Sequence, residues 1–294
     1  MELRTLQYFL AIAQEENMTR AAAQLHVSQP SLSRQLAQLE RQYKVQLFIR
    51  DKHRLILTDA GRLLRRRAQE MLLLADKAEQ ELLGNHLVAG NISFGCGETK
   101  NVAVLSQHMA AFGRIHPEVT FSLFTLIADE VKDRLANGTL DFGLVLEPVD
   151  ISTYNYLQYP IPESWCVLVR KDCPLAAKEV VTPEDLIGYP LIMAQRRSVR
   201  NELEHWFGPA FPQVHIWVTS NLSYSNRSLM VKNGLGVALA HEFEGMDPEL
   251  RQIPLSPGLI DQTYLVWNKY QELSPAVGAF VDYARQQLEG TGDE

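Results

Sequence analysis

Apolar side chains recur at three- and four-residue steps along the start of the chain, and this spacing predicts an amphipathic helix over about 3–15. Asn17 offers a polar N-cap to a second helix over 20–26. After a short break, Pro30 suits the first turn of a third helix, which a stripe of leucines extends to about Tyr43. Three short helices with a tight break before the last predict a helix-turn-helix unit.

Two short runs of strand character follow, 47–50 and 54–57, and the charged turn between them predicts a hairpin, or wing. A long helix then begins after Thr58, and its apolar positions step alternately by four and three residues, as in a coiled-coil seam. The positions of this predicted dimerisation seam are Leu64, Ala68, Met71, Ala75, Ala78 and Leu82. Strongly polar flanks leave a narrow stripe, which favours a partner helix and hence a dimer. The alternative is a helix that packs on its own domain.

Strand-like runs alternate with helical patterns from about residue 90 to the end of the chain. The expected strands are 92–96, 120–126, 142–146, 165–169, 191–193, 213–218, 237–240 and 262–267. The expected helices are 102–115, 129–137, 183–186, 199–207, 224–232 and 275–288. Alternation of this kind is typical of an α/β fold with mainly parallel sheets.

Composition narrows the class of protein. The 294 residues allow about two domains, and 46% apolar with 21% charged residues is ordinary for a globular protein, which excludes disorder. Three cysteines without a CxxC pair indicate neither a disulfide framework nor a zinc ribbon. Polar residues at 14–17 interrupt the first helix before a signal-peptide core could form, and no apolar run approaches the ~18 residues that span a bilayer. We therefore expect a cytoplasmic protein without a membrane segment.

Charge is distributed unevenly along the chain. Of 28 basic and 35 acidic side chains, residues 1–67 hold 12 basic and 6 acidic ones, so the acidic excess lies entirely in the remainder. This asymmetry suggests that the N-terminal part meets a polyanion. Basic side chains of the third helix and wing are placed to neutralise phosphates, which predicts binding to double-stranded DNA that weakens steeply with salt.

Base recognition is expected at the start of the third helix, where small or bidentate side chains allow close entry into the major groove. Lys52 and Arg54 of the wing could reach a minor groove. For any single basic residue a solvated surface role is the alternative, and the grouping on two adjacent elements favours DNA. The candidate DNA-binding residues are Thr19, Arg20, Ser28, Gln29, Pro30, Ser31, Ser33, Arg34, Arg50, Lys52, His53 and Arg54.

The segment TRAAAQLHVSQPSLSRQLAQLERQYKVQLFIRDKHRLILTDAG resembles the winged helix-turn-helix of the LysR-type transcriptional regulators. Ala pairs, a VSQPSLS turn, a leucine stripe, LF-x-R and LT-x-AG follow the family's order across residues 19–61. GNISFGCGETK, NGTLDFGLV and GLGVALAH resemble three motifs of the family's effector domain, so the resemblance covers essentially the whole chain. The chain departs from the pattern at Tyr43-Lys44, where Leu-Gly is usual, at Gly97, often Ser, and at His241-Glu242, which replaces Leu-Pro.

The resemblance implies a winged helix-turn-helix DNA-binding domain over 1–58, a linker and dimerisation helix over 59–89, and a periplasmic-binding-protein-like effector domain over 90–294. Its lobe I would span about 90–160 and 265–294, and its lobe II about 161–264, with a small-molecule cleft between them. The implied function is that of a sequence-specific transcriptional regulator whose promoter binding or activation a small-molecule effector modulates. The implied partners are promoter DNA, the effector, a second copy through the linker helix, further copies in a tetramer, and RNA polymerase at an activated promoter. No cofactor, metal ion or membrane is expected.

Loops at the carboxyl ends of parallel strands are where α/β folds bind ligands, and they supply the candidate cleft residues. The loop 97–101 also opens a helix, whose N-terminal amides favour an anion. With positions taken from the family, the candidate effector-binding residues are Gly97, Glu98, Thr99, Lys100, Asn101, Ile127, Ala128, Leu146, Glu147, Gln195, Arg196, Arg197, Ser198, Asn221, Leu222 and Ser223.

Three arginines, at 196, 197 and 200, would bring guanidinium groups near this cleft and indicate an effector that carries a carboxylate. A solvated arginine face is the alternative, and Glu98 and Glu147 would repel a carboxylate unless they are paired. Cys96 beside the cleft could sense oxidants, as some relatives do, or pack as a small apolar residue. The His241–Glu244 run has weak spacing for a metal site.

Two other classes of function are weighed against the regulator. One is a solute-binding or enzymatic α/β domain fused to a DNA-binding head, but the chain has no G-x-S-x-G, P-loop, H-E-x-x-H or Rossmann glycine triplet, so an enzyme is not expected. The other is an architectural DNA protein that uses its C-terminal domain only to oligomerise. An open cleft with polar walls would favour the regulator, and a cleft filled by apolar side chains the architectural protein.

Overall fold

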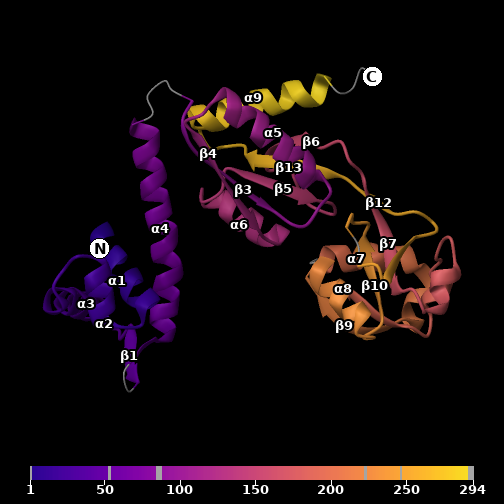
Figure 1. The fold of residues 1–294 in the computed structure, drawn as a ribbon, viewed down its shortest axis with the longest axis horizontal. Helices are drawn as coiled ribbons and strands as arrows, with labels where there is room; N and C mark the ends of the chain where they lie inside the picture. Colours follow the sequence, from indigo (N-terminus) through magenta and orange to yellow (C-terminus); the bar gives the residue numbers. More distant parts are fainter. Residues whose placement is uncertain (1, 52–53, 84–87, 222–223, 246, 291–294) are drawn as a thin grey trace. The chain divides into compact units, whose positions relative to one another are not determined.

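Two units make up the chain, Met1–Asn85 and His86–Glu294, and each is described by itself (Figure 1). The computed structural model describes residues 2–51, 54–83, 88–221, 224–245 and 247–290, apart from the side chains of 50, 51 and 80–83.

The N-terminal unit is a winged helix-turn-helix followed by a long helix. Its elements are α1 (Leu3–Glu15), α2 (Met18–Gln24), α3 (Gln29–Tyr43), the antiparallel hairpin β1 (Phe48–Asp51) and β2 (Arg54–Leu57), and α4 (Asp59–Leu83). The Asn17 side chain accepts hydrogen bonds from the backbone N–H groups of Thr19 and Arg20, at 3.0 and 3.1 Å, so α2 begins two residues earlier than predicted. Lys44 ends α3 in the left-handed conformation, φ 53°, without the usual glycine.

One small core holds the three helices, the wing and the first half of α4 together. Leu32, Leu36 and Leu39 form the buried stripe of α3, as predicted. The ring of Phe9 in α1 lies 5.4 Å from that of Phe48 in the wing, which fixes the hairpin to the helices. Because a helix buries its apolar stripe in order to be stable, this core sets the orientation of α3.

The first half of α4 packs on this core. Ala68 is fully buried and Leu64 packs beside it, so the first two positions of the predicted seam belong to the core of their own unit. For this half of the helix, the predicted dimerisation seam is replaced by the alternative, a helix that packs on its own domain. Three other apolar side chains of α4, Leu63, Met71 and Leu74, are 56, 37 and 39% exposed. Leu82 lies outside the residues whose side chains are described.

The first lobe of the C-terminal unit is a five-stranded sheet in the order β4-β3-β5-β13-β6. Its strands are β3 (Gly90–Cys96), β4 (Val119–Thr125), β5 (Phe142–Leu146), β6 (Tyr154–Gln158) and β13 (Thr263–Asn268). The first three are parallel, and β13 and β6 add antiparallel pairs. Helices α5 (Asn101–Ile115) and α9 (Pro275–Gly290) pack on one face, and α6 (Ala128–Ala136) packs on the other.

The second lobe repeats this plan, with the order β11-β7-β10-β8-β9 and β12 paired to β7. Its strands are β7 (Glu163–Arg170), β8 (Pro190–Ala194), β9 (His215–Ser220), β10 (Val237–His241), β11 (Leu250–Pro254) and β12 (Ile260–Asp261). Its helices are α7 (Arg197–Phe207), α8 (Tyr224–Lys232) and the 3-10 helices η1 (Pro174–Ala177), η2 (Glu184–Leu186) and η3 (Gly208–Gln213).

The prediction of mainly parallel sheets holds for most strands, but each sheet contains one reversed strand, β13 in the first lobe and β7 in the second, that is antiparallel to both of its neighbours. The chain crosses between the lobes twice, and strands that follow a crossing run against their neighbours. Because β13 pairs with β5 from Thr263 onward, residues 263 and 264 belong to the first sheet and not to lobe II. Strands β6, β11 and β12 were not predicted, because their apolar residues are too sparse to form a strand pattern.

Gly61 in the first turn of α4 should not tolerate a side chain. A Cβ there would lie 2.2 Å from the backbone oxygen of Leu47, so we expect Gly61→Ala to lower the free energy of unfolding by about 1–3 kcal/mol. Gly278→Ala in α9 is the matched control, since nothing lies within 4 Å of its Cβ position. Replacing this helical glycine should stabilise by about 0.5–1 kcal/mol. Urea unfolding measures both changes, and equal midpoints for the two variants would contradict the close approach.

Candidate functional site

The N-terminal end of α3 is presented to solvent. Ser28, Gln29 and Pro30 are exposed there, while Leu32 is fully buried and anchors the same turn to the core. The Ser28 side chain caps the helix, because its hydroxyl accepts a hydrogen bond from the backbone N–H of Ser31 at 3.3 Å. Ser31 and Ser33 are half-buried. This end of the helix therefore offers small side chains, one exposed amide and first-turn N–H groups to a ligand.

The predicted basic residues differ in how they are held. Arg34 is exposed and makes no ion pair among the described residues, so its charge is available to a phosphate. Arg20 pairs with Glu15 at 3.0 Å, and Arg54 lies 3.8 Å from Glu16. Thr19 is exposed at the start of α2. The side chain of Arg50, and Lys52 and His53 altogether, lie outside the described residues.

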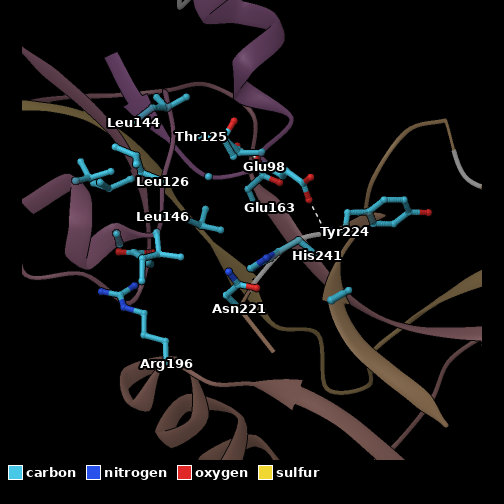
Figure 2. A pocket seen from close by; sticks show the side chains of 18 of the residues that line it. Glu98, Thr125, Leu126, Leu144, Leu146, Glu163, Arg196, Asn221, Tyr224 and His241 are labelled. Carbon is cyan, nitrogen blue, oxygen red and sulfur yellow. Dashed lines mark hydrogen bonds between the residues drawn. The ribbon is translucent and has the colours of Figure 1, made fainter. Parts of the chain in front are cut away.

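A cavity of about 510 Å³ opens between the two lobes of the C-terminal unit (Figure 2). Its walls come from the segments that follow β3, β4 and β5 in the first lobe and β8, β9 and β10 in the second. These segments are the carboxyl ends of the parallel strands, where the general rule for α/β sheets places ligands. The cleft is open and has both polar and apolar walls, which favours the regulator over the architectural protein.

Most of the predicted effector-binding residues lie on the wall of this cleft. Those that line it are Gly97, Glu98, Thr99, Ile127, Ala128, Leu146, Glu147, Gln195, Arg196, Arg197 and Asn221. Lys100, Asn101 and Ser198 are not among the lining residues, and Leu222 and Ser223 lie outside the described residues.

The loop 97–101 is tied to the start of the second lobe. The buried amide of Asn101 donates to the Ile161 carbonyl at 2.7 Å and accepts from the Ile161 N–H at 3.1 Å. The Thr99 hydroxyl donates to the buried Glu163 carboxylate, which also accepts from the Lys100 N–H at 2.9 Å. The Lys100 ammonium lies 3.1 Å from Glu242. Lys100 and Asn101 therefore connect the two lobes, which explains why they do not line the cleft.

The arginine cluster predicted from the sequence is not an open anion site. Arg196 lines the cleft but lies 3.6 Å from Asp129, its ion-pair partner. Arg200 is 4.0 Å from Glu204 and is absent from the cleft wall. Arg197 is exposed at the rim.

Arg227 is a cleft residue that the sequence analysis missed. It is only 3% exposed, and its Nη1 donates to the Leu239 carbonyl at 2.6 Å. Burial lowers the pKa of this guanidinium to about 10, so it stays charged at neutral pH. Its position four residues before the buried Val231 puts both on one helix face, and that spacing was the signal available in the sequence.

His241 is a second missed residue. Its imidazole Nε2 lies 2.7 Å from the Asp261 carboxylate, and its ring centroid is 4.1 Å from that of Trp165. Burial lowers the pKa of His241 to about 3, so the ring is neutral and its Nε2 is hydrogen-bonded to Asp261 without an ion pair. This histidine, whose spacing did not support a metal site, is therefore a hydrogen-bonding partner in the wall of the cleft.

Two acidic side chains, the buried Asp261 and the half-buried Glu202, lie together behind this wall. Asp261 is 1% exposed and accepts from the Trp165 indole N–H at 2.9 Å. Burial raises the pKa of Asp261 well above its ordinary value. Burial, followed by the neighbouring Asp261 carboxyl, raises the pKa of Glu202 in the same direction. The pair therefore retains a proton toward neutral pH.

Cys96 and Cys166 carry no reactive thiol, and the described residues form no metal site. Cys96 and Cys166 are buried, and burial raises their pKa values to about 11 and 12, so both are protonated thiols that pack in the core. Within the described ranges, no group of three or more histidine, cysteine or acidic side chains could hold a metal ion. No helix in the part of the chain that the structure describes has the length and apolar character to cross a bilayer.

Two family models match the chain. The bacterial regulatory helix-turn-helix protein, lysR family, matches residues 3–62, and the LysR substrate binding domain matches residues 85–289. The Hca operon transcriptional activator HcaR of Escherichia coli (strain K12) is 30% identical over 299 residues, which cover 98% of this chain and 98% of the relative.

Solved structures are similar along the whole chain. HinK, a LysR family transcriptional regulator from Pseudomonas aeruginosa, aligns with a TM-score of 0.58 at 27% identity, over 98% of each chain. Full-length CbnR complexed with target DNA aligns with a TM-score of 0.74 at 22% identity, over 97% of this chain and 99% of that one. The predicted fold class, a winged helix-turn-helix, a linker helix and a two-lobed effector domain, is confirmed.

The buried acid pair should make stability fall as pH rises through neutrality. A raised carboxyl pKa contributes stability that is complete below the ordinary value, about 4, and is lost as pH passes the folded-state pKa. The lowered pKa of His241 acts in the opposite direction but only below its ordinary value, so it does not contribute above about pH 6.5. We expect Glu202→Gln to reduce the fall in Tm between about pH 6.5 and 8 by roughly 2–4 °C.

Scanning calorimetry of the full chain measures this difference. Glu204→Gln, two positions along α7 and paired only with the half-buried Arg200 among the described residues, is the control and should keep the wild-type dependence. Parallel curves for the wild type and Glu202→Gln would show that the pair does not titrate in this range.

Proposed function

The chain belongs to the LysR family of DNA-binding transcriptional regulators, and we propose that it reads promoter DNA with the N-terminal end of α3 and responds to a small molecule in the cleft of its C-terminal unit. Its relatives are regulators, and the chain is not an enzyme. The observation that carries the proposal is the solvent-facing start of α3, where the exposed Gln29 and Arg34 lie on a helix anchored by buried leucines, and Arg34 makes no ion pair among the described residues.

Gln29 and Arg34 have different tasks in this proposal. An exposed glutamine amide can form paired hydrogen bonds with adenine in the major groove, so Gln29 reads bases. Arg34 lies farther along the helix and neutralises a phosphate, which adds affinity without sequence information. The structure of CbnR with target DNA, a protein of the same fold on a duplex, supports this use of the N-terminal unit. The predicted set from Thr19 to Arg54 is proposed as the DNA-contacting surface, and the protein acts in the cytoplasm, where its promoter is.

We place the dimer contact on the exposed apolar side of α4. Leu63, Met71 and Leu74 lie on this side, next to the stripe that packs on the core of the unit. Ala75 and Ala78 of the predicted seam extend it with small side chains, which allow a partner helix to approach closely. The proposed division is a DNA-binding domain over 1–58, a linker helix over 59–89 and an effector domain over 90–294. We also propose that two dimers pair into a tetramer and that the protein contacts RNA polymerase at an activated promoter.

Gln29→Ala and Arg34→Ala should have separable effects on DNA binding. Gln29→Ala should reduce the preference for the promoter over random duplex by about 1–3 kcal/mol, because one base contact is lost. Arg34→Ala should weaken binding to both duplexes alike and reduce the slope of log K against log salt by about 1. Fluorescence anisotropy over a salt series measures both quantities. Arg114→Ala on α5 of the other unit is the control, and equal losses of specificity from both head variants would contradict this division.

Met71→Asp should dissociate the dimer. A carboxylate buried in an apolar helix contact costs at least about 2 kcal/mol, which raises the dimer dissociation constant by roughly 30-fold. Leu73→Asp is the matched control, because Leu73 and Met71 are both 37% exposed but lie on nearly opposite sides of α4. Sedimentation velocity distinguishes the species. Dissociation by Leu73→Asp alone would place the contact on the other side of the helix.

A further inference from the structure

The cleft contains one buried cation whose hydrogen-bonding capacity is only partly used. Arg227 is 3% exposed, and its Nε has no hydrogen-bond partner among the described residues. Its Nη1 bonds to a carbonyl and not to a carboxylate. Burying a charged group without an opposite charge is costly, so a binding site that retains one is suited to an anionic ligand.

The acidic side chains of the cleft, in contrast, have partners. Glu147 accepts from the Gln262 N–H at 2.9 Å and from the Tyr264 hydroxyl at 3.2 Å. Glu163 is bonded by the loop 97–101, Glu242 by Lys100, and Asp129 by Arg196. Glu130 accepts from the Ile127 N–H at 3.4 Å. These contacts reduce the repulsion that the acidic wall would exert on an incoming anion, and they leave Arg227 as the buried charge to be met.

Glu98 already places a carboxylate at this position. It reaches from the first lobe to the first turn of α8 in the second lobe, where its carboxylate accepts a hydrogen bond from the backbone N–H of Tyr224 (Figure 2). The same carboxylate favours the charged form of Arg227, one turn farther along α8. The start of α8 and Arg227 thus act together on one negative charge, supplied by the protein itself.

We propose that the effector carries a carboxylate, which displaces Glu98 from the first turn of α8 and pairs with Arg227. This inference rests on the proposed function, in which the cleft is the effector site, and it specifies the chemical class. The opposite wall presents Leu126, Leu144 and Leu146, so the rest of the effector is apolar (Figure 2). Displacing Glu98 breaks one link between the loop 97–101 and the second lobe, so binding changes how the lobes are held together.

The test compares acids with neutral amides of the same shape in the full chain. The probes are cyclohexanecarboxylate and isobutyrate against cyclohexanecarboxamide and isobutyramide, each at up to about 50 mM and constant ionic strength, with Tm as the readout. We expect an acid to raise Tm, because it binds the folded state, while its amide does not. A response to the amides equal to that of the acids, or no response to either acid, overturns the proposal.

Variants on both sides of the contact locate the binding. Arg227→Gln should raise the apparent Kd for the acid by at least about 30-fold, because a buried charge partner is lost, and Arg227→Lys should retain part of the response. Glu98→Gln should lower the Kd by about tenfold, since the competing negative charge is removed. Arg200→Gln is the control and should match the wild type, because Arg200 pairs with Glu204 away from the cleft wall.

The Glu98 variant keeps the test decisive if Arg227→Gln fails to fold. An acid response that Glu98→Gln and Arg227→Lys both leave unchanged overturns the proposal. Salt-sensitive DNA binding of the wild type, measured on the same preparation, separates the two levels of inference. If DNA binding is present and the amides bind as well as the acids, the chemical class is wrong and the regulator stands. If DNA binding is absent, the proposed function itself fails.

Discussion

The architecture of the C-terminal unit depends on the hydrogen bonds that the Glu163 carboxylate accepts. Glu163 is 1% exposed and stands where the chain enters the second sheet, and a buried carboxylate must be satisfied by hydrogen bonds or by charge. Its donors all come from one loop of the first lobe, Thr99, Lys100 and Asn101. The need to satisfy this one group therefore determines where the loop lies and, with it, the position of Glu98 at the edge of the cleft.

Local pattern predicted most of the fold because most elements bury an apolar stripe of their own. The leucines of α3 and the apolar run of β5 are sufficient to identify these elements, and the lining of the cleft by loops 97–99 and 146–147 follows from where parallel strands end. The hydrophobic pattern failed to predict elements whose structure depends on pairing with a strand distant in the sequence. The edge strand β6 has an exposed, polar sequence and exists through its ladder with β13.

The cleft was predicted less completely for a similar reason. Arg227 is a buried cation only because the carbonyl of Leu239, on a strand twelve residues later, receives its Nη1–H. His241 is neutral because it is buried, and its hydrogen-bond partner Asp261 and its ring neighbour Trp165 arrive from β12 and β7. No local spacing encodes such partners. The arginines at 196, 197 and 200 suggested an anion site through their number, but the structure gives two of them acidic partners. The DNA-contacting and effector-contacting residues themselves stay predictions.

The second crossing between the lobes has a consequence for how the protein is made. β13 lies between β5 and β6 in the first sheet, yet it is synthesised more than a hundred residues after either of them has begun. The N-terminal unit has a hydrophobic core of its own within the first 85 residues and can fold while the ribosome is still adding the rest. The first lobe must wait with an open sheet edge until β13 arrives. A chain that stops early would thus have a folded DNA-binding domain and an incomplete effector domain. Such nascent fragments could occupy operators without the ability to respond to the effector.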